Sequence, residues 1–331
     1  MEQQKMINFM GQRKLASAIS IVLVIGSLIG LFVKGLNLGI DFTGGTIIEL
    51  AYDKPVDIDN VRTSLQQKGF KSIIVQNFGA AEDVLIRIAP QKGMNSAQIS
   101  NKVLDTLRAE GEHIDLRRVE FVGPQVGDEL TEQGALAVIY ALIGILIYVA
   151  LRFEFRFAVG SVAALIHDVI ITLGVFAWGQ LQFDLTVLAA ILAVIGYSLN
   201  DTIVVFDRVR ENFRTMREGS PVEVTNVAVN QMLSRTIMTS LTTLVVLVAL
   251  FFLGGEIIHN FALALIVGIV VGTYSSTYIA SAIALALGVS KADLMKPEKS
   301  GQTAEEAEAE LQRAFLEAEA KREAKLAQKQ K

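Results

Sequence analysis

Long apolar stretches alternate with polar connections along most of the chain, and six of them are as long as a membrane-spanning helix. An α-helix rises about 1.5 Å per residue, so roughly 20 apolar residues cross a hydrocarbon layer of about 30 Å. The expected spans are residues 15–33, 134–151, 157–179, 185–206, 233–253 and 260–287. The pattern predicts a polytopic α-helical membrane protein with six transmembrane helices.

The segment between the first two spans, residues 36–130, is too polar to cross a membrane and shows a different pattern. Two helices are expected, one from Val56 to Lys68 and one that Asn95 caps and Gly111 ends. Strands are expected at residues 46–52, 72–78, 84–89 and 115–123. The order β-α-β-β-α-β predicts one ferredoxin-like α+β domain, and about 80 residues suffice for its core.

Both ends of the chain are polar. The first 14 residues carry Arg13 and Lys14, and residues 289–331 are rich in Ala, Glu, Lys and Leu. These residue types favour a helix, but apolar positions are too sparse for a buried face. A solvated, charged cytoplasmic tail is expected. Docking to a cytoplasmic or ribosomal partner, or to anionic membrane lipids, is the alternative.

Positive charge predicts the orientation of the spans. Arginines stand in the turn between the second and third spans and in the loop after the fourth: Arg152, Arg156, Arg208, Arg210, Arg214 and Arg217. The loops 179–184 and 254–260 contain no Lys or Arg. Cytoplasmic loops are enriched in these residues. Both termini are therefore expected in the cytoplasm, and the domain of residues 36–130 on the outer, periplasmic side.

Composition narrows the functional classes. The chain is 52% hydrophobic with a mean hydropathy of +0.45, which agrees with a membrane protein. It contains no cysteine, so disulfides and thiolate metal sites are excluded, and no metal or cofactor is expected. The net charge of −4 gives no support to nucleic-acid binding. The first apolar run lacks a small-x-small cleavage site, so it is interpreted as a retained helix rather than a signal peptide.

The most informative single residue is Asp201, a carboxylate inside the fourth apolar span. Placing a charge at that depth costs about 2.5–3.5 kcal/mol on insertion scales. Arg235 stands in the opening turn of the fifth span, which runs antiparallel to the fourth, so both lie in the inner half at similar depth. The two residues are predicted to form an ion-coupling pair, because protonation of Asp201 would leave Arg235 uncompensated. The alternative is a static pair that only fixes helix register.

Other polar residues in the spans are weaker candidates. Ser198 and Asn200 flank Asp201 and could line an ion path, although hydroxyls in membrane helices mostly bond to backbone or a neighbouring helix. His167 and Asp168 lie in the third span and could support a proton relay or simply be satisfied by packing. Adjacent helical residues point about 100° apart, so these two are not expected to face each other.

A glycine pair marks the exit from the first span. Gly44 and Gly45 follow Asp41 in the run Asp-Phe-Thr-Gly-Gly, immediately before the first expected strand. Glycine adopts positive φ at little cost, so a turn is expected here. No Lys-Ser/Thr follows, which argues against a phosphate-binding loop.

Several runs together resemble the SecD/SecF family of the RND superfamily, the auxiliary membrane subunits of the bacterial Sec protein translocase. The matching segments are residues 35–50, 118–130, 164–174, 194–212 and 234–243. The short outer domain favours the SecF branch, because SecD members have a much larger outer region.

The resemblance implies a non-enzymatic subunit that acts with SecD. The pair couples a proton or sodium gradient to export of preproteins across the inner membrane, after the SecA-driven stage. Six helices of each subunit would form an RND-like core, in which Asp201 and Arg235 match the family's coupling residues and SecD supplies a further aspartate. The implied partners are SecD, the SecYEG channel, YajC, YidC and the translocating preprotein.

Three other functions compete with this interpretation. An RND-type exporter of lipids or small molecules would need a larger outer domain or two of them. An intramembrane aspartyl protease would need two apposed carboxylates, for which Asp168 and Asp201 are the candidates. A purely structural scaffold for the translocase is the third.

Overall fold

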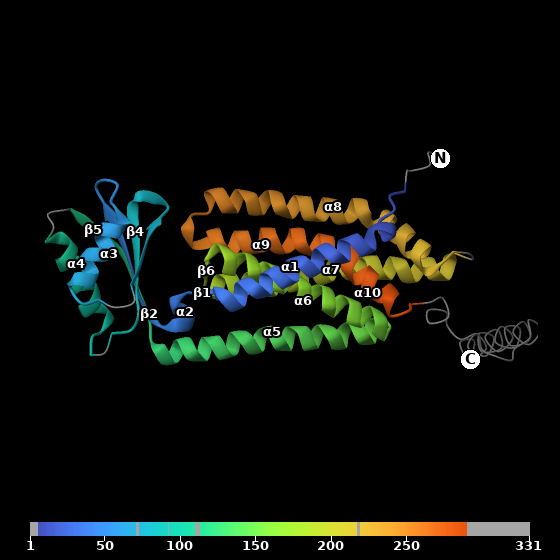
Figure 1. Cartoon of the computed structure of the whole chain (residues 1–331), viewed down its shortest axis with the longest axis horizontal. Helices are drawn as coiled ribbons and strands as arrows, with labels where there is room; N and C mark the ends of the chain where they lie inside the picture. The colour runs from blue at the N-terminus through green and yellow to red at the C-terminus, as the bar shows by residue number, and fades with distance from the viewer. Residues whose placement is uncertain (1–5, 71–72, 92, 110–112, 217–218, 290–331) are drawn as a thin grey trace, which may run out of the picture. The chain divides into compact units, whose positions relative to one another are not determined.

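The computed structural model describes residues 6–70, 73–91, 93–109, 113–216 and 219–289 (Figure 1). The tail predicted for residues 289–331 therefore lies outside the described residues, apart from Val289, and so do the first five residues.

The described residues contain six helices that are long and apolar enough to cross a membrane, and each overlaps one predicted span (Figure 1). They are α1 (Arg13–Val33), preceded by the short helix η1 (Met10–Gln12), α5 (Pro124–Arg152), α6 (Phe155–Gly179), α7 (Leu185–Thr215), α8 (Pro221–Leu253) and α9 (Glu256–Ser275). A π-helical turn, η2 (Ser276–Ala280), and α10 (Ser281–Ala286) continue α9. The predicted polytopic α-helical fold is confirmed.

The sheet domain lies between α1 and α5 and consists of six elements. They are β2 (Gly45–Tyr52), α3 (Ile58–Gln67), β3 (Ile73–Phe78), β4 (Ala80–Ile88), α4 (Ser96–Arg108) and β5 (Ile114–Val122). The strand order is β3-β4-β2-β5, and every neighbouring pair is antiparallel. This is the ferredoxin-like arrangement that the sequence predicts.

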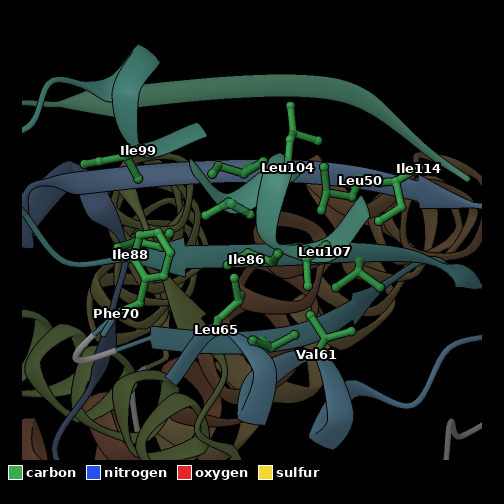
Figure 2. Packing of buried hydrophobic residues seen from close by; sticks show 14 of the residues in the cluster. Leu50, Val61, Leu65, Phe70, Ile86, Ile88, Ile99, Leu104, Leu107 and Ile114 are labelled. Atoms are coloured by element: carbon green, nitrogen blue, oxygen red, sulfur yellow. The ribbon is translucent and has the colours of Figure 1, made fainter. Parts of the chain in front are cut away.

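One face of this sheet is covered by α3 and α4, and Figure 2 shows the side chains that fill the space between them. Alternate residues of β2, such as Ile48 and Leu50, point to this face and are completely buried. Leu65 of α3 and Ile99 of α4 meet them from the helix side. Burying one such side chain contributes about 1.5–3 kcal/mol, so this cluster accounts for a separate domain core.

Side-chain caps set where the two domain helices begin. Asn95 caps α4, and its side chain and that of Gln98 each bond the other's backbone N–H, as a capping box does. α3 begins at Ile58 rather than at the predicted Val56, because Asp57 accepts a hydrogen bond from the N–H of Asp59 and acts as its cap.

A small neck that the sequence did not predict joins the sheet domain to the membrane helices. It consists of β1 (Asn37–Leu38), the one-turn helix α2 (Ile40–Thr43) and β6 (Gln182–Phe183), which pairs with β1 in parallel. Gly44 and Gly45 follow α2 with φ of +66° and +134°. The turn is tightly packed, since a Cβ added to Gly45 would lie 2.6 Å from a backbone oxygen of β4.

The helix α7 contacts α6, α8 and α9, and its buried face carries several polar side chains. α9 approaches it closely at Gly268 and Gly272, where an added Cβ would lie 2.2 Å and 3.0 Å from side-chain atoms of α7. Small residues permit such close approach of membrane helices. The packing therefore brings polar groups of α6, α7 and α9 within hydrogen-bonding distance of one another.

Candidate functional site

Asp201 lies on the buried face of α7, and its side chain is 4% exposed. Its Oδ2 atom is buried and accepts no hydrogen bond from any described residue. The hydroxyls of Thr202 and of Thr236, on α8, are also buried and without a hydrogen-bond partner among the described residues. Most buried polar atoms in folded proteins are paired, so these three unpaired atoms on α7 and α8 are unusual.

Arg235 is exposed on α8, whereas Asp201 faces the interior of the helix group. The described residues contain no direct ion pair between the two. The expected pair is therefore not in contact within this chain. The depth argument placed both residues near the same level, but it could not fix the direction in which each side chain points.

Asp168 of α6 forms a polar junction between three helices. It is fully buried, and its Oδ2 accepts hydrogen bonds from Ser198 Oγ of α7 at 2.6 Å and from Ser275 Oγ of α9 at 2.7 Å. Both hydroxyls are buried as well. These two hydrogen bonds connect α6, α7 and α9 to one another at one level.

His167 contacts the other carboxylate oxygen, with Nδ1 2.9 Å from Asp168 Oδ1. The expectation that these adjacent residues do not face each other is wrong. Their Cα–Cβ bonds diverge, but side-chain rotation brings the ring and the carboxylate together. The imidazole also stacks on Tyr274 of α9 with ring centroids 6.3 Å apart, while its Nε2 is buried without a partner among the described residues.

Ser198 and Asp201 are three residues apart, so they share a face of α7 and are separated along it by about 4.5 Å. The Asp168 junction therefore lies about one helical turn from Asp201. Asn200, the other predicted member of an ion path, is exposed and points away from this buried face.

Sequence reasoning missed Ser275 and the π-helical turn that follows it. Ser275 continues the spacing of Gly268 and Gly272 on α9, so its place on the face toward α7 could have been inferred. The π-helix η2 begins at the next residue, and such turns are common at functional sites. No residue pattern indicated it.

Asp41 has a definite role in the neck, although the sequence indicated only a turn. Its Oδ2 accepts a hydrogen bond from the backbone N–H of Leu185 at 3.0 Å, the first residue of α7. Asp184 is the N-cap of the same helix and accepts from the N–H of Val187 at 3.0 Å. Two carboxylates therefore stabilise the start of the helix that carries Asp201.

The geometry argues against the protease alternative. An aspartyl dyad needs two carboxylates that share one proton. The oxygens of Asp168 instead contact Ser198, Ser275 and His167, and no hydrogen bond joins Asp168 to Asp201 among the described residues. Within the same residues, no group of three His, Asp or Glu side chains could hold a metal ion.

Two family descriptions match the chain. Residues 29–56 match the SecD/SecF GG motif, and residues 102–290 match the C-terminal part of the protein export membrane proteins SecD and SecF. The chain belongs to the SecD/SecF family. The second match contains the SecD/SecF helices from α5 to α10, and the first contains the neck residues Asp41, Gly44 and Gly45.

Individual members of the family place the chain in its SecF branch. The protein translocase subunit SecF of Vibrio alginolyticus is 51% identical over 92% of this chain and 97% of its own length. SecF of Pseudomonas aeruginosa is 49% identical over 88% of this chain and 95% of its own. The resemblance to SecF is thereby confirmed.

Solved structures of SecDF have the same fold. In the crystal structure of SecDF from Thermus thermophilus, the matching part is 39% identical, covers 87% of this chain and has a TM-score of 0.79. SecDF in a super-membrane-facing form matches with a TM-score of 0.65. The chain spans 39% of the SecDF chain in each case. It is thus a multi-pass membrane protein of a protein export family.

Proposed function

We propose that this chain is one half of a SecD–SecF unit in the bacterial inner membrane, and that the unit couples a proton or sodium gradient to preprotein export. It would act after the SecA-driven stage, alongside the SecYEG channel, YajC and YidC. The observation that carries the proposal is Asp201, a buried carboxylate with an unpaired oxygen in a membrane-length helix.

An unpaired carboxylate oxygen in an apolar region destabilises the protein, so binding a cation there is strongly favourable. Leaving a buried charged group without its hydrogen bonds costs several kcal/mol. A proton removes the charge of Asp201, whereas Na⁺ would supply the missing partner. Either ion is a transported species in this proposal rather than a resident cofactor. The group is therefore suited to alternate between occupied and vacant states.

The exposed polar groups beside this site support a partner chain in the membrane. Asn200 and Arg235 are exposed on α7 and α8, within helices that are long enough to cross the hydrocarbon layer. Polar side chains are rarely left facing lipid. Gly196 also leaves open space on this face of α7. SecD would cover the surface, bring its own aspartate toward Asp201 and Arg235, and complete the site.

The Asp168 junction would support the coupling by limiting how α7 can move. Ser198 and Ser275 tie α7 and α9 to α6, one turn from Asp201. When the charge of Asp201 changes, α7 would then be restrained at the level of Ser198. The π-helix beside Ser275 offers a place where α9 can adjust without breaking the junction.

The arginine distribution supports an orientation with both termini in the cytoplasm and the sheet domain in the periplasm. Arg208 bonds Gln231, and Arg152 pairs with Asp207 at 3.1 Å, near the ends of the expected spans that would lie at the cytoplasmic surface. The unit would carry out transport without catalysing a covalent reaction.

The test is gradient-driven export in vesicles that contain the chain with SecD and the channel. Asp201→Asn and Arg235→Met should each abolish the stimulation of export by an imposed gradient, while ATP-driven export by SecA continues. Asp207→Asn is the matched control, since it removes a carboxylate from the same helix at an exposed position. It should export like the unmodified protein.

Two results would decide against the proposal. Full gradient stimulation in both variants, with normal assembly with SecD, would show that the pair does not couple ion movement to export. An equal loss of gradient stimulation in Asp207→Asn would show that the assay reports a general effect of charge on α7. Separate proton and sodium gradients would identify the coupling ion.

A further inference from the structure

Arg87 of β4 is an arginine that is only 6% exposed, at the boundary between the sheet domain and the neck. Arginine is seldom buried unless it is paired. Its Nη1 donates to the backbone oxygen of Leu38 at 2.9 Å and to Asn37 Oδ1 at 3.2 Å. Both acceptors belong to β1, so a charged side chain of the sheet domain is anchored on the neck.

The neck is in turn bonded to the start of α7. β1 pairs with β6, and the N–H of Gly39 donates to the oxygen of Phe183 at 2.7 Å, one residue before the helix cap Asp184. Asp41 accepts from the N–H of Leu185 at 3.0 Å. Arg87 is therefore connected to the first turn of α7 through hydrogen bonds and a few residues of backbone in β1 and β6.

The charges around Arg87 favour this arrangement. Burial lowers the pKa of the Arg87 guanidinium, and the nearby carboxylates of Asp184 and Asp41 oppose that shift. An arginine stays protonated throughout the ordinary pH range. The two carboxylates at the N-terminus of α7 thus face one buried positive charge that the sheet domain supplies.

α7 is a continuous helix from Leu185 to Asp201 and beyond, so the neck and the proposed coupling carboxylate are joined by a rod of about 24 Å. A displacement of this rod along or about its axis moves Asp184 and the backbone of Leu185 with it. The sheet domain also packs on the neck through Ile47 and Leu85, which meet Ile40 of α2, and its Gly79 lies close to Glu256 of α9. Arg87 adds a charged contact from the sheet domain to β1, which pairs with β6 just before α7 begins.

We infer that Arg87 is a positioning residue that transmits movement of α7 to the sheet domain. The inference rests on the proposed function and goes beyond it, because it names where ion binding and domain movement are connected. Nε and Nη2 of Arg87 have no hydrogen-bond partner among the described residues. Arg87 can therefore bond Asp41 or Asp184 as the neck moves, and need not stay fixed to β1.

The test separates ion uptake from export in proteoliposomes that hold the chain with SecD and the channel. Arg87→Gln should keep ion uptake close to that of the unmodified protein. It should lower gradient-stimulated export about tenfold, which is within the range of single-residue effects on coupling. Arg87→Lys, which keeps the charge, should recover part of the export. Arg117→Gln is the matched control, because this arginine of the sheet domain is exposed and remote from the neck contacts.

The outcomes are distinguishable. Loss of both ion uptake and export in Arg87→Gln, or full export with normal uptake, overturns the inference. Absence of gradient stimulation in the unmodified protein overturns the proposed function and this inference with it. If Arg87→Gln does not assemble, Asn37→Ala removes one acceptor from the neck side and should lower export with ion uptake retained. Full export in Asn37→Ala would then overturn the inference.

Discussion

The Asp168 junction allows a quantitative test of whether a charged carboxylate holds the three helices together. Ser275→Ala removes one hydroxyl that donates to Asp168 Oδ2 at 2.7 Å and leaves a side chain of nearly the same size. Hydrogen bonds between membrane helices contribute about 0.6 kcal/mol on average and about 1.7 kcal/mol at most. Bonds to charged groups contribute about 1.5–3 kcal/mol in general. Because Ser275 and Asp168 are both fully buried, we expect a loss near the upper membrane value, about 1.5 kcal/mol.

Ser276→Ala is the matched control. This next residue is equally buried, but its hydroxyl donates to the backbone oxygen of Thr273 at 3.1 Å, within its own helix. Removing it should cost less than about 0.6 kcal/mol, since the acceptor is neutral and already part of a helix. The free energy of unfolding would be measured for both variants in mixed micelles with increasing fractions of a denaturing detergent.

A double variant sharpens this prediction. Ser198→Ala should cost about as much as Ser275→Ala, because both hydroxyls donate to the same oxygen. Removing both leaves Oδ2 without either donor, so the double variant should lose more than the sum of the single losses, by about 1 kcal/mol. Equal effects of Ser275→Ala and Ser276→Ala, or strict additivity, would refute the idea that Asp168 is a charged three-helix junction.

Three further predictions concern the packing of the described residues. Leu65→Ala should destabilise the sheet domain by about 2–5 kcal/mol, because Leu65 is fully buried. Ile74→Ala should change the stability little, because Ile74 is 42% exposed. Denaturation of the purified chain would measure both. Gly174→Ala should weaken the packing of α1 on α6, since an added Cβ would lie 2.2 Å from a serine of α1. Gly26→Ala is the control and should be neutral, because its added Cβ meets no atom within 4 Å. The yield of cross-linking between the two helices would be compared for the two variants. Gly45→Ala should abolish folding of the neck, measured as loss of assembled protein, because its φ of +134° and the 2.6 Å approach to β4 both exclude a side chain.

The sequence predicted the large elements because each has a strong local signal. Apolar runs give the membrane helices, and alternation between turn residues gives the strands of the ferredoxin-like domain. The helix cap at Asn95 and the turn at Gly44 and Gly45 are visible without tertiary contacts, and the structure has both. The neck was not predictable in the same way. β1 and β6 are two residues long, and they pair across more than 140 positions, so no local pattern marks them.

The site was harder to predict than the fold because its chemistry depends on side-chain direction. Depth along a helix follows from residue number, which is why Asp201 and Arg235 were expected near one level. Their faces do not follow from depth, and an apolar membrane helix lacks the polar face that would indicate its orientation in a soluble protein. The contact between His167 and Asp168 depends on rotamers, which adjacency in sequence does not determine.

The different environments of the two buried carboxylates explain why we assign the coupling role to Asp201. Asp168 has two hydroxyl donors on one oxygen and an imidazole nitrogen beside the other, so both of its oxygens have partners. Such a group gains little from a bound cation, and its loss would separate three helices. Asp201 has an oxygen without any donor among the described residues, and its charged neighbour Arg235 lies on the exposed side of α8. A cation or a partner chain can therefore change the energy of Asp201 far more than that of Asp168. On this reasoning Asp168 maintains the geometry of α6, α7 and α9, and Asp201 responds to the ion.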